Sequence, residues 1–207
     1  MQTITLIDTL SVLGTAVFAL TGAMSAARKR FDLFGMIVLA GLVGLGGGTL
    51  RDLLLGRLPV FWVREPWDLM LTSGVAVMSF FFLQSLTKLK LVFLWADALG
   101  LATFAVVGTA VALEQNVAYY LAPVFGMFTA CFGGLMRDVI ANERPLILYG
   151  ELYASAALAG AAAYSLVIYL GLGESTAALI ALAVGLVMRA IGIIWRVHLP
   201  KPKVTGW

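Results

Sequence analysis

Long apolar runs are the feature that most constrains what this chain can fold into. The runs are about 20 residues long, and a helix of that length crosses about 30 Å of hydrocarbon at 1.5 Å per residue. The chain is 61% hydrophobic and 12% charged, with a mean hydropathy of +0.99. A membrane β-barrel would instead show short alternating segments. The sequence therefore predicts an all-α integral membrane protein with seven transmembrane helices: Ile4–Ala27, Leu33–Gly56, Leu69–Leu86, Leu91–Leu113, Tyr119–Ala141, Leu152–Leu172 and Ala177–Arg196.

The basic residues predict how these spans are oriented. The loops after the first, third and fifth spans and the C-terminal tail, counted with their helix ends, hold 11 of the 14 Lys and Arg side chains. Cytoplasmic loops carry such an excess. We therefore expect a multi-pass protein of the cell inner membrane, with its N-terminus outside and its C-terminus cytoplasmic, and a basic tail that contacts membrane lipids. The 11 residues are Arg28, Lys29, Arg30, Lys88, Lys90, Arg137, Arg144, Arg189, Arg196, Lys201 and Lys203.

The second half of the chain repeats the first half at a constant offset of 86 residues. GGGTLRD, which begins at Gly46, corresponds to GGLMRD, which begins at Gly133, and a proline follows each motif at the same distance. One offset without a gap aligns charged residues, prolines and glycines over more than 50 positions, which indicates an internal repeat. The matched pairs are Gly14/Gly100, Phe18/Phe104, Ala19/Ala105, Gly22/Gly108, Gly47/Gly133, Gly48/Gly134, Arg51/Arg137, Asp52/Asp138, Pro59/Pro145 and Glu65/Glu151.

This repeat predicts the domain organisation. Each copy contains three spans, and only KLK separates the third span from the fourth. Because three is odd, the second copy is expected to lie upside down relative to the first. We predict a first repeat at residues 1–86, a second, inverted repeat at 87–172, and a seventh helix with a basic cytoplasmic tail at 173–207.

The paired motifs are the candidate functional site, because substrate and ion sites of inverted-repeat membrane proteins lie at the repeat interface beside interrupted helices. We expect the glycines to interrupt the second and fifth spans and to free carbonyl oxygens for a cation. Each arginine would neutralise its neighbouring aspartate while a pathway is closed. The alternative is structural: glycines often serve helix packing, and such ion pairs can lie at the interface. The residues are Gly46, Gly47, Gly48, Arg51, Asp52, Gly133, Gly134, Arg137 and Asp138.

Three further polar residues lie inside the apolar spans. Asp97 is either a cation ligand or the partner of a basic residue, and its repeat counterpart is Ser11. Thr21 either lines water or packs between helices. Arg189 is expected to extend towards the inner membrane surface or to bind anionic lipid.

Several function classes are excluded on the same residues. The single cysteine, Cys131, cannot form an internal disulfide, and the single histidine, His198, cannot form a two-histidine metal site. There is no nucleophile–base arrangement and no phosphate loop, so we expect no enzyme, no metal and no cofactor. The basic residues flank apolar spans rather than forming one patch, which disfavours nucleic-acid binding. No basic leader precedes Ile4, so no cleaved signal peptide is expected.

The doubled glycine–Arg–Asp motif and the three-plus-three-plus-one layout resemble the prokaryotic trimeric intracellular cation channels. The resemblance implies a homotrimer with one pore in each protomer, between bent second and fifth helices, and monovalent permeant cations, mainly potassium. It also implies that Gly46, Gly47, Gly48, Gly133 and Gly134 are bend residues, and that Arg51, Asp52, Arg137 and Asp138 lie near the pathway.

Two other functions remain open. Bacterial members of this family are also described as glycine transporters, which implies a secondary carrier that works by alternating access between the inverted halves. A structural membrane subunit without a pathway is a third reading. The repeat-equivalent Arg–Asp pairs argue against it, since structural helices do not need them.

Overall fold

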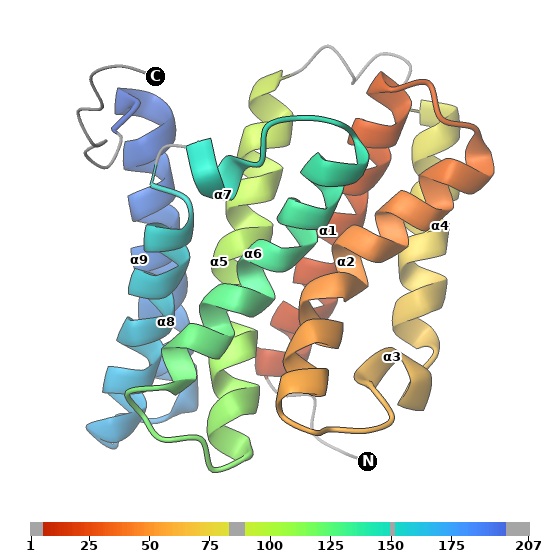
Figure 1. The fold of residues 1–207 in the computed structure, drawn as a ribbon. Coiled ribbons are helices and arrows are strands. Elements are labelled where there is room, and N and C mark those ends of the chain that lie inside the picture. Colours follow the sequence, from red (N-terminus) through yellow and green to blue (C-terminus); the bar gives the residue numbers. More distant parts are fainter. Residues whose placement is uncertain (1–5, 83–89, 150–151, 198–207) are drawn as a thin grey trace, which may run out of the picture.

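The computed structural model describes residues 6–82, 90–149 and 152–197, and every regular element in those ranges is a helix (Figure 1). The predicted boundary between the repeats, the matched Glu151 and the end of the basic tail lie outside the described residues. The helices are α1 (Leu6–Arg28), α2 (Leu33–Leu54), α3 (Phe61–Arg64), α4 (Trp67–Phe82), α5 (Lys90–Glu114), α6 (Ala122–Ile140), α7 (Leu146–Tyr149), α8 (Ala154–Tyr169) and α9 (Glu174–Trp195).

Five of these helices are long and apolar enough to cross a membrane, namely α1, α2, α5, α6 and α9. The third and sixth predicted spans correspond to the shorter apolar helices α4 and α8, of 16 residues each. The chain is therefore an all-α membrane protein, and the count of seven crossing helices stays a prediction. The one-turn helices α3 and α7 were not predicted, because four residues are too few to show a helical period.

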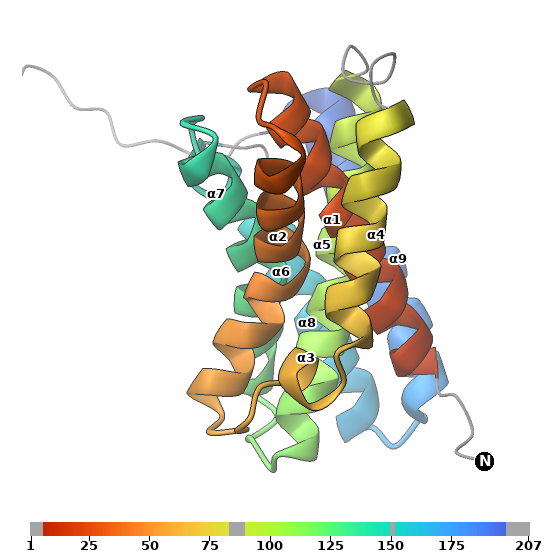
Figure 2. The same cartoon turned by 90° about the vertical axis from the view of Figure 1, so that its right-hand side faces the viewer.

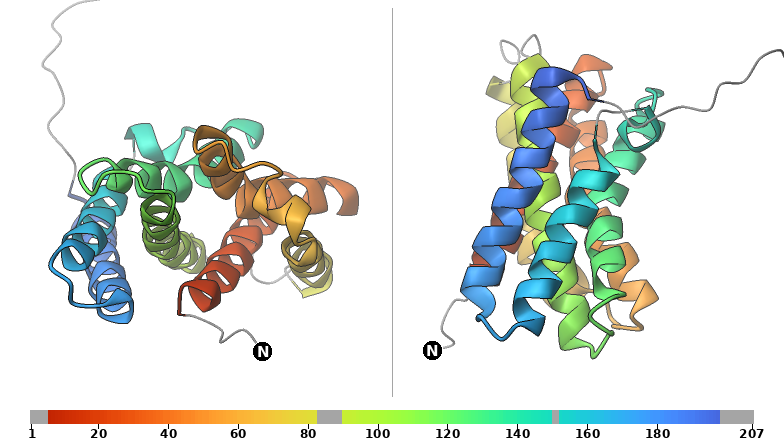
Figure 3. Two further views of the ribbon diagram at one scale, coloured as in Figure 1. Left: turned by 90° about the horizontal axis from the view of Figure 1, so that it is seen from below. Right: turned by 90° about the vertical axis from the view of Figure 1, so that its left-hand side faces the viewer.

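The helices form two groups. Seen from below, α1, α2 and α4 lie on one side, α5, α6 and α8 on the other, and α9 covers the outside of the second group (Figure 3). Helix α1 rises and α5 descends in Figure 1, and α2 descends where α6 rises. The helices of one group thus run opposite to their counterparts in the other.

Small residues let the two groups approach closely at α1 and α5. Phe18 of α1 lies over Gly100 of α5, and a side chain at Gly100 would overlap its ring. Phe104 of α5 lies over Gly14 of α1 in the same way, with a ring carbon 3.3 Å from the place of a Cβ atom. The two rings are 5.3 Å apart between centroids. The 86-residue offset relates one contact to the other, because Phe18 corresponds to Phe104 and Gly14 to Gly100.

The same local signals end α2 and α6. Gly56 follows α2 with φ +67°, and Asn142 follows α6 with φ +49°. Glycine and asparagine are the residues that most readily adopt this left-handed conformation after a helix. In both turns a backbone N–H returns to the aspartate carbonyl at 2.8 Å, from Arg57 to Asp52 and from Glu143 to Asp138. Each turn leads into a one-turn helix, α3 or α7.

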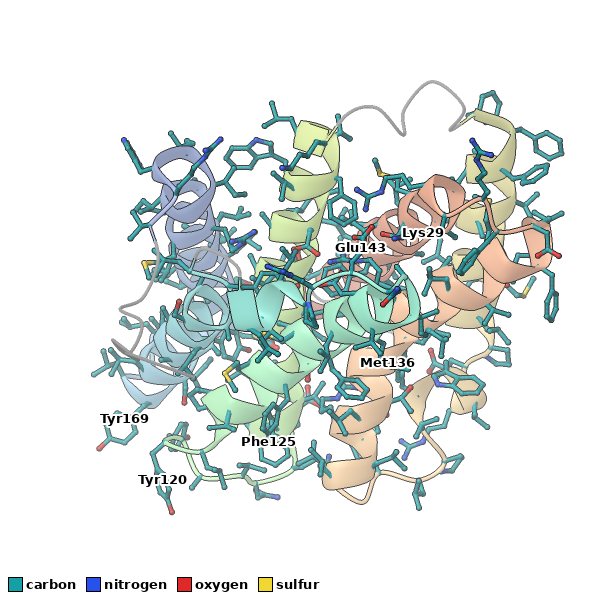
Figure 4. All side chains as sticks on the ribbon, turned by 45° about the horizontal axis from the view of Figure 1, so that its top comes forward. Lys29, Tyr120, Phe125, Met136, Glu143 and Tyr169 are labelled. Atoms are coloured by element: carbon teal, nitrogen blue, oxygen red, sulfur yellow. The ribbon has the colours of Figure 1, made fainter. Side chains whose placement is uncertain are left out.

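Two ends of the bundle are used as reference points below. The Arg51 end carries α3 and the loop after α2, and the Arg137 end carries α7 and the loop after α6 (Figures 1 and 2). Glu143, in the loop after α6, lies 3.5 Å from Lys29 and 3.8 Å from Arg28, at the end of α1. Figure 4 shows Lys29 and Glu143 close together. The loops after the first and fifth predicted spans therefore lie at the same end, as the topology requires.

Candidate functional site

Helices α2 and α6 cross in direct backbone contact. A Cβ atom on Gly47 would overlap the carbonyl oxygen of Thr129, and one on Gly133 would overlap the carbonyl oxygen of Val43. Thr129 and Val43 are themselves related by the 86-residue offset. The glycines at the centre of each motif therefore permit a crossing that no other residue would allow.

The other motif glycines accommodate side chains. Gly46 lies against the Met136 sulfur, at 3.1 Å from the place of a Cβ atom. Gly48 lies against the ring of Phe61, with a ring carbon 2.6 Å from the place of a Cβ atom. Gly134 lies against the Tyr153 hydroxyl, whose oxygen is 2.5 Å from the place of a Cβ atom. A Cβ atom would overlap a neighbour at Gly47, Gly48, Gly133 and Gly134, whereas at Gly46 the Met136 side chain would have to move by a few tenths of an ångström.

The predicted interruption of the helices at these glycines is absent. Helix α2 is continuous from Leu33 to Leu54, and α6 from Ala122 to Ile140. Helix α2 changes direction part-way along its length in Figure 2, but it remains a helix. Helices α2 and α6 pack closely against each other at these glycines, and this packing supports both helices. The carbonyl groups therefore stay within the helical backbone.

The Arg51–Asp52 pair is buried, with 5% and 1% of each residue exposed. Arg51 donates from Nε and Nη2 to Asp52 Oδ1 at 2.9 and 2.8 Å. The second oxygen of Asp52 accepts the backbone N–H of Phe61 at 2.8 Å, at the start of α3. The carboxylate therefore neutralises the arginine and also anchors the short helix.

The Arg137–Asp138 pair repeats this geometry at the opposite end. Arg137 Nε donates to Asp138 Oδ1 at 2.9 Å, and Asp138 Oδ2 accepts the N–H of Leu146 at 2.8 Å, at the start of α7. The predicted pairing of arginine with aspartate is thus present in both motifs. Both pairs are almost fully inside the protein, which does not fit an interfacial role.

Arg137 has further partners that Arg51 lacks. Its Nη1 donates to Asp97 Oδ1 at 2.6 Å and to Thr21 Oγ1 at 3.2 Å. Both arginines also make a cation–π contact: the Arg137 guanidinium lies 4.6 Å from the centre of the Phe93 ring, and the Arg51 guanidinium lies 5.7 Å from the centre of the Phe61 ring. Arg137, Asp97 and Thr21 are all completely buried. Of the two roles considered for Asp97, the structure shows the partner of a basic residue.

Two polar atoms of this cluster are incompletely bonded. Asp97 Oδ2 and Arg137 Nη2 are buried without a hydrogen-bond partner in the described part of the chain. Leaving such groups unsatisfied costs about 1–3 kcal/mol or more for charged groups. The Asp97–Arg137 pair is therefore bonded through Oδ1 and Nη1, whereas one further oxygen and one further nitrogen lack a partner.

Tyr153 and Arg189 join the same cluster and were missed as site residues. The Tyr153 hydroxyl lies 3.5 Å from Asp97 Oδ1, and the Arg189 guanidinium lies 5.1 Å from the centre of the Tyr153 ring. Arg189 is only 2% exposed, so the prediction that it extends to the membrane surface is wrong. The aromatic face of Tyr153 is a partner for the Arg189 charge inside the protein. The sequence signal that could have identified Arg189 as a site residue is its position inside an apolar span, where arginine is rare.

A polar cavity of about 260 Å³ lies at the Arg51 end, between α1, α2, α3, α4 and α5. Arg51 and Ser11 line it, together with charged residues of α1, of the segment from α2 to α4 and of α5. The two arginines of the repeat thus differ in surroundings: Arg137 is completely buried among its partners, whereas Arg51, which is 5% exposed, also lines a cavity.

Comparisons with known proteins agree with this arrangement. A family model described as glycine transporter matches residues 8–84 and 94–169, two segments that begin 86 residues apart. The UPF0126 inner membrane protein YadS of Escherichia coli strain K12 is 35% identical over 193 residues, covering 92% of this chain and 93% of that protein.

Solved structures decide the family. The TRIC trimeric intracellular cation channel orthologue from Rhodobacter sphaeroides is 41% identical, with a TM-score of 0.90, over 94% of this chain and 100% of that chain. This chain belongs to the TRIC channel family. A second TRIC cation channel, solved to explain conductance, is 31% identical with a TM-score of 0.88, over 98% of this chain and 100% of its own. The TRIC fold is therefore present over almost the whole chain.

Proposed function

We propose that this TRIC-family protein is a cation channel of the inner membrane, permeable to potassium, with one pore in each protomer of a homotrimer. The observation that carries the proposal is the pair of buried Arg–Asp motifs at opposite ends of the α2–α6 crossing. Buried charges inside membrane helices are costly, and they mark ion or substrate pathways. The TRIC structures of similar fold are of cation channels.

The proposed architecture is an inverted three-plus-three repeat followed by one extra helix. It is supported by the antiparallel directions of α1 and α5 and of α2 and α6 (Figure 1). The matched turn, ion-pair and glycine contacts of the two motifs support it further. In this proposal the repeats span 1–86 and 87–172, and the pore lies at their interface, along α2 and α6.

In the proposed mechanism the Arg–Asp pairs are gates. With Arg137 bound to Asp97 and Asp138, both carboxylates are held by one guanidinium and the polar atoms at this end face one another. Movement of Arg137 away from Asp97 would free a carboxylate to face a passing cation. The unsatisfied Asp97 Oδ2 and Arg137 Nη2 are the atoms that water or an ion would bond first.

Because the glycine helices are continuous, carboxylates and hydroxyls take the role expected of freed carbonyls. Gly47 and Gly133 hold α2 and α6 together, so that a small shift at the crossing would move both motifs. Thr21 contributes a hydroxyl to the same cluster. The permeant potassium ion is the substrate, and the proposal assigns no reaction, no cofactor and no nucleic acid.

We further propose that the Arg137 end faces the cytoplasm, with the N-terminus outside and the C-terminus inside. The excess of Lys and Arg at this end supports that orientation. Basic residues there would contact anionic lipid headgroups.

A flux assay tests the proposal. Purified protein in liposomes with an outward potassium gradient should release potassium without any amino acid present. Asp52→Asn and Asp138→Asn should each change the flux, because each removes a charge from a proposed gate. Unchanged flux in both variants would contradict the gating role of the pairs.

The same liposomes separate the channel from the glycine carrier. A carrier would take up radiolabelled glycine and saturate, while potassium release without glycine would be absent. Potassium release that does not depend on glycine supports the channel. Glycine uptake without potassium release would contradict the channel and favour the glycine carrier.

A further inference from the structure

The residues around the two repeated arginines differ between the halves of the chain. At the positions that the offset of 86 relates, the matched pairs are Asp97/Ser11, Thr21/Val107 and Tyr153/Trp67. Trp67 is 63% exposed, whereas Tyr153 is 3% exposed. The second half of the chain therefore has a buried aromatic ring where the first half has an exposed one.

Tyr153, the residue before α8, lies between the proposed gate and the helix that carries the repeated motif. Its hydroxyl is 3.5 Å from Asp97 Oδ1 of α5, the oxygen that also accepts Arg137 Nη1 at 2.6 Å. The same hydroxyl fills the space beside Gly134 of α6, where its oxygen is 2.5 Å from the place of a Cβ atom. The hydroxyl is thus fixed between the Asp97 carboxylate and the α6 backbone.

The ring of Tyr153 is held by a charge from α9. The Arg189 guanidinium lies 5.1 Å from the centre of this ring, and Arg189 is only 2% exposed. A cation over an aromatic face is attracted more strongly when it is desolvated than at an exposed site. Movement of the ring would take this partner away from a buried charge, so the contact opposes displacement of Tyr153.

Helix α9 is itself packed closely against the helices that border this cluster. A Cβ atom on Gly185 of α9 would lie 3.2 Å from the Ala102 side chain of α5. One on Gly160 of α8 would lie 3.0 Å from the carbonyl oxygen of Ala181 of α9. Small residues thus let α9 lie directly on α5 and α8, outside the second group of helices (Figure 3). A shift of α9 would therefore be transmitted to Tyr153.

We propose that α9 regulates the gate at the Arg137 end through a chain of two contacts. Arg189 holds the ring of Tyr153, and the Tyr153 hydroxyl holds the Asp97 carboxylate in place on Arg137. Tyr153 and Arg189 are positioning residues, because both act on the ion pair rather than on the permeant ion. Regulation of the pore rests on the proposed channel function, whereas the contact chain does not.

Tyr153→Phe tests the hydroxyl, because it keeps the ring beside Arg189 and removes the hydrogen bond to Asp97. It should raise the open fraction in bilayer recording about fivefold, the usual effect of one hydrogen bond. In an Asp97→Asn background the same change should have an effect of about twofold or less, because a hydrogen bond to a neutral acceptor is weaker. A hydroxyl that only fills space would change both proteins equally.

Arg189→Met tests the link to α9, because it keeps a long side chain and removes the charge. It should raise the open fraction about fivefold alone. In the Tyr153→Phe background it should add about twofold or less, since the hydroxyl that it positions is absent. If Arg189→Met does not fold, Arg189→Gln replaces it with the same expectation.

Two matched variants control for side effects. Arg189→Lys keeps a cation over the ring and should stay within about twofold of the unchanged protein. Tyr164→Phe removes the hydroxyl of another buried tyrosine, inside α8, and should also stay within about twofold.

Hydrogen exchange followed by mass spectrometry gives a second readout that needs no conduction. Exchange in residues 137–149 reports opening of the Arg137 end, and residues 51–63 are the matched segment at the other end. Tyr153→Phe and Arg189→Met should each speed exchange in 137–149 about fivefold and leave 51–63 within about twofold. The Asp97→Asn background should remove most of the effect of Tyr153→Phe.

The two readouts separate this proposal from the channel. Faster exchange in residues 137–149 that depends on the Asp97 carboxylate, together with a higher open fraction, supports the regulation. Unchanged exchange and opening in Tyr153→Phe, or equal changes with and without that carboxylate, would overturn it even in a conducting protein. The expected exchange pattern in a protein that conducts no potassium would support the contact chain and contradict the channel.

Discussion

At the scale of single residues, the Asp97–Arg137 pair is the contact on which the proposed closure depends. Asp97→Asn keeps the size of the side chain and removes its charge from a buried pair joined at 2.6 Å. Breaking such a pair is destabilising, and we expect a loss of about 2 kcal/mol or more, since Asp138 remains beside Arg137. We also expect a higher fraction of open channels. Thermal unfolding of the purified protein and bilayer recording measure the two effects.

Glu143→Gln is the control at the same end of the molecule. It breaks contacts of 3.5 and 3.8 Å with Lys29 and Arg28, whose side chains are 35% and 29% exposed (Figure 4). Exposed pairs contribute about 0–1 kcal/mol. A stability loss in Glu143→Gln as large as that in Asp97→Asn would show that burial is not what makes the inner pair important.

Sequence reasoning identified the Arg–Asp pairs and named Asp97 and Thr21 as candidates, but it did not predict that these two side chains meet Arg137. Charged neighbours inside an apolar run stand out, and their pairing is local to one helix. The partners of Arg137 come from α1 and α5, and Tyr153 comes from the start of α8. Which side chains meet across helices depends on the rotation of each helix about its axis, and a single sequence does not contain that angle.

At the scale of elements, the crossing of α2 and α6 rests on glycines 47 and 133. Gly47→Ala and Gly133→Ala should each destabilise the protein by about 2 kcal/mol or more, because the added methyl group meets a backbone carbonyl that cannot move without the helix. Thermal unfolding with size-exclusion chromatography measures this loss.

Gly74 in α4 is the matched control, because nothing lies within 4 Å of a Cβ atom there. Gly74→Ala should be neutral or stabilising by up to about 1 kcal/mol, since alanine is the better helix former. Equal effects at positions 47, 74 and 133 would show that helix propensity, rather than the crossing, sets the stability.

The long helices were predictable because length and hydropathy decide them. It was not predictable that α2 and α6 would continue through their glycines. Adjacent glycines weaken a helix in isolation, and the sequence therefore suggested a break. In the structure α2 and α6 support one another through the same glycines, so packing overrides propensity. The helices α3 and α7 depend on Asp52 and Asp138, which accept their first backbone N–H groups.

At the scale of the whole molecule, the proposed topology places the C-terminus in the cytoplasm. A green fluorescent protein fused after residue 207 should therefore fluoresce, and alkaline phosphatase fused there should be inactive, because the first folds only inside and the second only outside the inner membrane. Active phosphatase at this position would contradict the orientation drawn from the positive charges.

The sequence predicts the repeat that organises the whole molecule, but it does not predict how the two ends differ. A constant offset of 86 residues is visible without a structure, and it relates the contacts at Phe18 and Phe104 and at Gly47 and Gly133. The difference between the two ends is not visible in the same way. It requires knowing that Ser11 and Val107 line a cavity beside Arg51, while Asp97 and Thr21 bind Arg137.

The most direct test of the central claim is single-channel recording of the purified protein in a planar bilayer, with a potassium gradient and no amino acid. We expect discrete unitary currents that reverse near the potassium equilibrium potential, and longer openings in Asp97→Asn. A silent bilayer, with insertion verified and Asp97→Asn equally silent, would contradict a cation pathway through this molecule.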